Sequence, residues 1–131
     1  MKKKIKEHSQ KILSDFSVNP ENVELKSQFL SGGNLQKLII GRELITSPEL
    51  LICFNPTWGL DVGAINYIHE TLIKINEQKK SIILISTDTD ELLKLCDKIC
   101  VIFKGKLSNI MDAEEVTSEK LGILMGGGEI V

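Results

Sequence analysis

Residues 30–37 read Leu-Ser-Gly-Gly-Asn-Leu-Gln-Lys, and the pattern around them predicts the start of a helix. Ser31 is suited to the N-cap, and apolar residues recur at helical spacing until Ser47 and Pro48 end the helix. Gly32 and Gly33 would offer unhindered amides at this N-terminus, where unpaired N–H groups and the helix dipole favour an anion. Taken alone, the stretch has two interpretations, a plain capped turn or a receptor for a terminal phosphate.

The rest of the chain alternates between helical and extended patterns. A helix is expected over residues 2–13, followed by a polar loop. Apolar runs at 50–54, 81–86 and 99–103 predict strands, and the first two have the composition of parallel strands that are buried on both faces. Further helices are expected at 61–78, from Asp88 or Asp90 to 95, and at 117–125, and the turn at 104–106 would lead into a fourth strand. This order predicts an α/β domain with right-handed crossovers.

Composition limits the classes of function. The 131 residues are 42% apolar, which is enough for one core, and the net charge of −2 argues against nucleic acid as a partner. No apolar run reaches the ~18 residues of a membrane span and no signal peptide is recognisable, so the chain is expected in the cytoplasm. A basic cluster near the N-terminus is either a solvated helix face or a site for an anionic partner; it contains Lys2, Lys3, Lys4, Lys6 and Lys11.

Several single residues have alternative interpretations. Cys53, Cys96 and Cys100 follow no zinc spacing, so we expect buried reduced thiols and no metal site. His69 lies on an apolar helix face and is expected at the edge of the core. Trp58 is either a packing residue or part of a dimer surface.

The segment Ser31-Gly32-Gly33, with Leu30 before it and Asn34, Gln36 and Lys37 after it, resembles the signature motif of ABC transporter ATP-binding proteins. GLDVGA at 59–64 and TSEKLGILMGG at 117–127 are similar to the simple-sugar and nucleoside importer branch of that family. The resemblance implies a P-loop NTPase-type three-layer α/β core, present here only in part. Residues 1–47 would belong to the ABC helical subdomain, and 48–131 to the C-terminal part of the nucleotide-binding core.

The same resemblance implies the site residues. Two cassettes would pack head to tail, so that one cassette's signature closes over ATP and Mg²⁺ that are held mainly by its partner. The signature residues implied to contact the phosphate in trans are Ser31, Gly32, Gly33, Asn34 and Gln36. Gly59, Leu60 and Asp61 correspond to the D-loop, although Asp61 is equally well explained as a helix cap.

Three departures from the family pattern imply that the chain by itself is inactive. Its 131 residues contain no G-x-x-x-x-G-K-[ST], so the Walker A strand and loop would lie on a longer parent or have been lost. Phe54 and Asn55 stand where the family has the Walker B acidic pair, and Thr87 stands at a switch position that is often histidine. Phenylalanine cannot bind a hard cation and an amide cannot accept a proton near neutral pH, so no catalytic residue is expected here.

The sequence therefore favours the motor segment of a sugar or nucleoside importer, bound to membrane permease subunits on the inner face of the cell membrane. The alternative is a non-catalytic regulatory or scaffolding module that keeps the cassette dimer surface. A non-transport ABC protein is disfavoured because the chain has no basic surface. If the missing strand and helix are absent, a bare apolar sheet face should drive association into a homo-oligomer.

Overall fold

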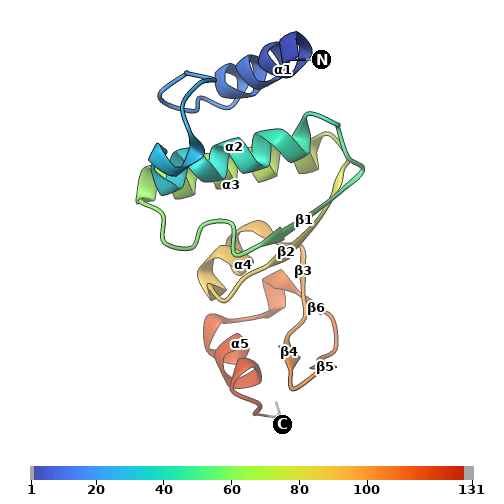
Figure 1. Ribbon diagram of the computed structural model, residues 1–131. Helices are drawn as coiled ribbons and strands as arrows, with labels where there is room; N and C mark the ends of the chain where they lie inside the picture. Colours follow the sequence, from blue (N-terminus) through green and yellow to red (C-terminus); the bar gives the residue numbers. More distant parts are fainter. Residues whose placement is uncertain (1, 129–131) are drawn as a thin grey trace. The chain divides into compact units, whose positions relative to one another are not determined.

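The computed structural model describes residues 2–128 (Figure 1). Its helices and strands are, in order, α1 Lys2–Asp15, η1 Ser27–Phe29, α2 Gly32–Leu44, β1 Leu50–Phe54, α3 Val62–Glu77, β2 Ser81–Ile85, α4 Thr89–Leu95, β3 Lys98–Ile99, β4 Ile102–Phe103, β5 Lys106–Leu107, β6 Met111–Asp112, η2 Ala113–Glu115 and α5 Ser118–Met125. Helices and strands alternate from α2 to β3, and helical elements precede this part of the chain while further short strands follow it. The predicted helices and the strands at 50–54 and 81–86 are confirmed, with ends that move by one or two residues. None of the described helices is long and apolar enough to cross a membrane.

Two compact units divide the chain. The first contains the residues up to Leu51 together with Pro56–Ile83, and the second contains Ile52–Asn55 together with the residues from Leu84 on. The boundary between them passes through β1 and β2. These units follow the density of contacts, so the subdomain boundary expected between residues 47 and 48 stays a prediction.

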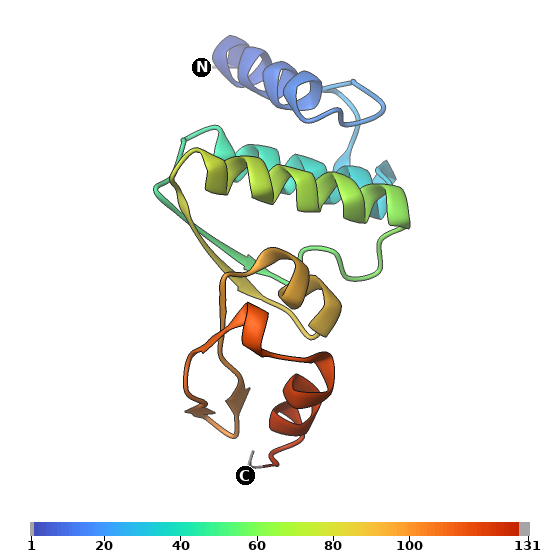
Figure 2. The same ribbon diagram turned by 180° about the vertical axis from the view of Figure 1, so that it is seen from behind.

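The first unit is built from α1, α2 and α3, and α2 and α3 lie side by side in both views (Figure 1, Figure 2). Its core contains Ile12 and Leu13 of α1, Ile40 of α2, and Ile68 and Leu72 of α3. Gly41 allows the end of α1 and the following Phe16 to approach α2 closely, because a Cβ there would lie 2.7 Å from both Ile12 Cγ2 and Phe16 Cδ2.

β1 and β2 pair in a two-stranded sheet. Ser81 N donates to Glu49 O at 2.9 Å and Asn55 N donates to Ile85 O at 2.7 Å, so the two strands run in parallel. The expectation that both faces are covered is wrong. In β1 the side chains of Leu51 and Cys53 are buried, whereas those of alternate residues are exposed, Ile52 by 62% and Phe54 by 72%. Successive side chains of a strand point to opposite faces, and residues 2–128 cover only one of them.

The second unit has its own core of Ile99, Val101, Val116 and Leu121. The prediction of one strand over 99–103 is wrong, because the strand is interrupted after Ile99 and a second strand begins at Ile102. Ile99 pairs with Met111 in one antiparallel sheet and Ile102 pairs with Leu107 in another. The predicted turn at 104–106 is confirmed as a tight hairpin, and both of its central residues, Lys104 and Gly105, have positive φ.

Candidate functional site

The start of α2 has the helix cap that the sequence predicts. Ser31 is extended (φ −63°, ψ 158°), and its Oγ accepts from Asn34 N at 3.4 Å and from Asn34 Nδ2 at 3.0 Å. The first backbone bond of the helix runs from Leu35 N to Ser31 O at 2.8 Å, so the amides of Gly32 and Gly33 precede it. Ser31 and Gly32 are exposed. This terminus therefore presents a hydroxyl and an amide to the solvent.

Gly33 differs from the expectation that both glycines are open, because it is buried. A Cβ built on Gly33 would lie 2.8 Å from Ala64 Cβ and 3.8 Å from Asp61 Oδ2. The residue therefore lies at the crossing between α2 and α3. The expectation that the glycine as a whole is open is wrong for Gly33, whereas phosphate binding by the signature residues, Gly33 included, stays a prediction.

Asn34 connects the helix start to the loop before it. Its Oδ1 accepts from Asn19 N at 2.8 Å while its Nδ2 donates to Ser31. Gln36 is half-buried in the first turns of α2. Lys37, one residue further on, lies over the ring of Tyr67 at 4.4 Å from its centroid, which adds a second contact between α2 and α3.

The segment Gly59-Leu60-Asp61 lies beside the start of α2. A Cβ built on Gly32 would lie 3.5 Å from Leu60 Cδ2. Gly59 has φ +74°, a left-handed conformation that favours glycine. Asp61 is the N-cap of α3, and its Oδ1 accepts from Ala64 N at 3.0 Å. Two segments that the sequence separates by almost 30 positions therefore form one surface of the first unit.

Asn55 and Thr87, two of the residues that depart from the family pattern, are in contact in the second unit. Asn55 follows β1 with φ 43°, and its Oδ1 accepts from the backbone N–H of Thr87 at 3.2 Å. The side chain of Phe54 is 72% exposed. The amide of Asn55 thus holds the backbone at position 87. No group of three or more His, Cys, Asp or Glu suited to a metal ion is found among residues 2–128.

The cysteines are only partly as expected. All three are free, with Cys53 buried, Cys96 half-buried and Cys100 exposed. The prediction that all three thiols are buried is therefore wrong for Cys100, which lies between β3 and β4. Burial, with a smaller effect from the charge of Glu91, raises the pKa of the Cys53 thiol to about 11. Burial also raises the pKa of Cys96, with smaller effects from Asp97 and Glu91.

The burial of His69 and of Trp58 bears on the interpretations that the sequence left open for them. His69 is buried on α3, as expected for a histidine beside the core. The indole of Trp58 is 83% exposed, which excludes a packing role among the described residues. The sequence did not single out Ala64, because its contact with Gly33 depends on how α3 packs against α2.

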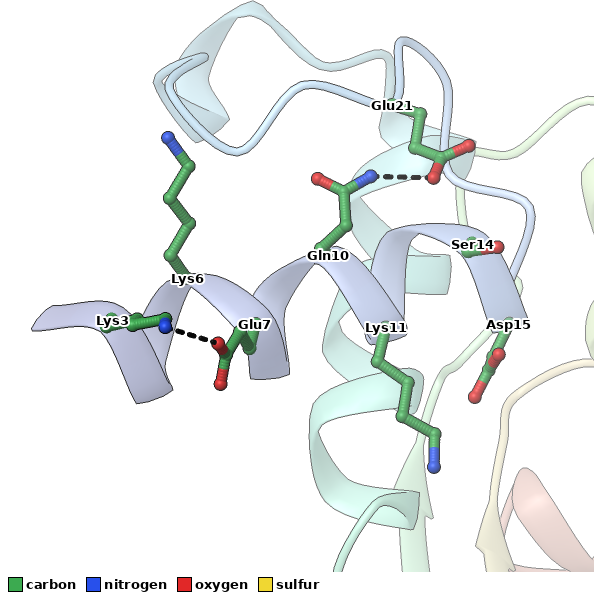
Figure 3. A pocket seen from close by; sticks show the side chains of 8 residues that line it. All are labelled: Lys3, Lys6, Glu7, Gln10, Lys11, Ser14, Asp15 and Glu21. Carbon is green, nitrogen blue, oxygen red and sulfur yellow. Dashed lines mark hydrogen bonds and ion pairs between the residues drawn. The ribbon is translucent and has the colours of Figure 1, made fainter.

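The basic N-terminal helix lines an open groove of about 670 Å³ (Figure 3). Acidic residues accompany its lysines: Lys3 pairs with Glu7 at 4.0 Å and Lys6 with Glu24 at 2.8 Å. The hydrogen bond from Lys6 lowers the pKa of Glu24. Because Lys3 and Lys6 are each paired with a glutamate on the surface, the groove favours the interpretation of a solvated helix face over a site for an anion.

The chain is similar to ATP-binding proteins of importers. No family model matches it. It is 44% identical over 127 residues to the nucleoside import ATP-binding protein NupA of Lactococcus lactis subsp. cremoris (strain MG1363), a match that covers 97% of the chain and 25% of that protein. It is 40% identical to the guanosine import ATP-binding protein NupO of Bacillus subtilis (strain 168), over 88% of the chain and 23% of that protein. The chain spans about a quarter of the length of these curated relatives.

Solved structures agree on the fold. The ADP conformation of MJ1267, an ATP-binding cassette of an ABC transporter, matches 92% of the chain and 45% of its own length with a TM-score of 0.67 at 22% identity. CbiO1 from Clostridium perfringens, part of the ABC transporter complex cbiONQ, matches 95% of the chain and 49% of its own length with a TM-score of 0.67 at 26% identity. The chain therefore has the fold of slightly less than half of each of these structures.

Proposed function

We propose that the chain is the C-terminal part of an ABC-type ATP-binding cassette of a sugar or nucleoside importer, and that it contributes a signature motif to ATP bound by a partner cassette. The observation that carries this proposal is the start of α2. Ser31 and Gly32 are exposed at the N-terminus of a 13-residue helix, and Leu60 lies beside them. Such a terminus favours a phosphate, since its free amides and dipole both attract negative charge.

The hydrogen bonds of Ser31 support the same chemistry. Its Oγ accepts from both nitrogens of Asn34, so the hydroxyl proton remains available to donate to a phosphate oxygen. Gly32 adds an exposed backbone N–H. Together they provide a donor pair suited to a terminal phosphoryl group that a neighbouring molecule presents. Asn34 positions the serine through its side-chain amide.

Phe54 and Asn55, which stand where the family pattern has acidic residues, support a mechanism in which only one of two ATP sites is active. Neither Phe54 nor Asn55 can hold Mg²⁺ with a carboxylate or activate water, and the oxygen of Asn55 is already bonded to Thr87 N. The magnesium ion and the attacking water would therefore be held by the partner cassette. One productive ATP site per motor follows from this proposal, with the second site binding poorly or not hydrolysing.

The proposed partners are a second cassette and the permease subunits of an importer for sugars or nucleosides, on the cytoplasmic side of the membrane. The curated relatives are import ATP-binding proteins for a nucleoside or guanosine. A second candidate function is a regulatory or scaffolding module that keeps the cassette surface without catalysis. The substitutions at Phe54 and Asn55 favour it, because they remove chemistry without disturbing the start of α2.

ATP turnover of the importer that contains this chain separates the two functions. Ser31→Arg places a long cation at the helix terminus and should abolish most of the turnover if the signature acts in trans. Ser14→Arg, on the exposed surface of α1, is the matched control and should leave the turnover unchanged. Unchanged turnover in Ser31→Arg would favour the scaffolding module, and turnover by the isolated 131-residue chain would contradict the proposed division of the site.

A further inference from the structure

The side-chain amide of Asn34 makes two hydrogen bonds, one as acceptor and one as donor. Its Oδ1 accepts from the backbone N–H of Asn19 at 2.8 Å, and its Nδ2 donates to Ser31 Oγ at 3.0 Å. A backbone N–H can only donate, so the amide oxygen must face Asn19 and the NH2 group must face Ser31. The bond to Asn19 therefore determines which end of the amide the serine meets.

The orientation of this amide decides where the hydroxyl proton of Ser31 can point. Ser31 Oγ accepts from Asn34 Nδ2 and also from the backbone N–H of Asn34 at 3.4 Å. These two donors occupy both lone pairs of the hydroxyl oxygen, so its proton points toward a third group. An amide turned by 180° would present its oxygen to the hydroxyl and take that proton. Because Ser31 is exposed, the third group can come from a neighbouring molecule.

The loop that supplies the N–H of Asn19 is also attached to α2 at a second point. Lys37, one turn further along α2 than Asn34, donates from Nζ to Ser17 O at 3.4 Å. The same ammonium lies 4.4 Å from the centroid of the Tyr67 ring, on α3. Residues 17–19 are thus held against the first turns of α2 by the side chains at positions 34 and 37.

We propose that Asn34 is a positioning residue, which passes the position of the loop at 17–19 to Ser31 and keeps the serine hydroxyl free to donate to a phosphoryl oxygen. The series of donors runs from the N–H of Asn19 through the amide of Asn34 to the hydroxyl. Hydrogen bonds in such a series polarise and strengthen one another. The inference rests on the proposed function, in which Ser31 meets ATP on a partner cassette, and it extends that site to a loop outside the signature motif.

Amide hydrogen exchange at Asn19, in the assembled importer without nucleotide, tests the first bond of the series. Asn34→Ala removes the acceptor and should make this exchange about tenfold faster, while alanine, a strong helix former, preserves α2. Asn34→Asp keeps an acceptor oxygen and should leave the exchange slow. Asn22→Ala is the matched control, because Asn22 Oδ1 accepts from Glu24 N at 3.0 Å in the same loop without reaching Ser31. Unchanged exchange at Asn19 in Asn34→Ala overturns the proposal.

A double-mutant cycle of ATP turnover in the same importer tests the second bond. Ser31→Ala should lower kcat by about tenfold or more, since it removes a hydrogen bond to a charged group. Asn34→Ala should lower kcat by about fivefold when the serine is present, and by under about twofold when position 31 is already alanine, because no hydroxyl is left to orient. KM should change little, because the partner holds most of the nucleotide. Asn22→Ala should leave kcat unchanged.

The outcomes separate this inference from the proposed function. If Ser31→Ala lowers kcat and Asn34→Ala lowers it by the same factor with and without the serine hydroxyl, the proposed function stands and the positioning role is refuted. If Ser31→Ala leaves turnover unchanged while Asn34→Ala still speeds exchange at Asn19, the hydrogen bonds stand and the role of both residues in ATP hydrolysis is rejected.

Discussion

Replacement of Asp61 divides its stabilising effect into a hydrogen bond and a charge. Asp61 is extended (φ −73°, ψ 161°) at the start of the 16-residue helix α3, and its Oδ1 accepts from Ala64 N at 3.0 Å. Asp61→Ala removes the cap, which costs about 1 kcal/mol, and the negative charge at the positive end of the dipole, which costs about 0.3–1 kcal/mol. Asp61→Asn keeps an acceptor oxygen and loses only the charge. We expect a loss of about 1–2 kcal/mol for alanine and under about 1 kcal/mol for asparagine.

Urea denaturation followed by circular dichroism measures both losses, at low salt and at about 0.5 M salt. The charge effect should fade at high salt because the exposed carboxylate is screened, whereas the loss of the cap should persist. Asp15→Ala is a suitable control, since an acid at the end of α1 opposes the dipole and its removal should be neutral or slightly stabilising. Equal losses for alanine and asparagine, or a loss in alanine that disappears with salt, would refute the assignment of Asp61 as a hydrogen-bonding cap.

Three further predictions concern packing, a thiol and the open sheet face. Gly41→Ala should lower the free energy of unfolding by about 1–2 kcal/mol in thermal melts, since its methyl group would lie 2.7 Å from the side chains of Ile12 and Phe16, whereas Gly122→Ala meets nothing within 4 Å and should be neutral or stabilising. The thiol of Cys53, with its pKa near 11, should alkylate about 100-fold more slowly in the folded chain than in the unfolded chain at pH 8, and far more slowly than the exposed Cys100. The folded state keeps a proton that the unfolded thiol loses above about pH 9, so the contribution of this thiol to stability should fall between about pH 9 and 11, and equal alkylation rates in both states would contradict the burial. Phe54→Ser should weaken self-association in sedimentation experiments while changing the free energy of unfolding by under about 0.5 kcal/mol, and a monomeric parent chain would contradict this expectation.

The elements that were correct in the sequence analysis depend on near neighbours in the chain. Ser31, Asp61 and Thr117 each accept a hydrogen bond from a backbone N–H three residues later, so the residue type and the following apolar period suffice to locate the helix starts. The hairpin turn at Lys104-Gly105 is local for the same reason. The wrong strand at 99–103 has its cause elsewhere, since Ile99 and Met111 pair across 12 positions and no local pattern gives that register.

In the candidate site too, some features can be predicted from the sequence and others depend on tertiary packing. The motif at 30–37, its place at a helix start and the missing acidic pair at 54 and 55 are readable from the residues themselves, because hydroxyl, amide and carboxylate chemistry belongs to the side chain. Its two glycines look alike in the sequence. Only the crossing of α2 over α3 separates them, since Ala64 approaches one and leaves the other open to solvent. Burial depends on which distant atoms come near, and those atoms are fixed when helices pack, so local sequence specified the parts of this surface and tertiary contact determined their roles.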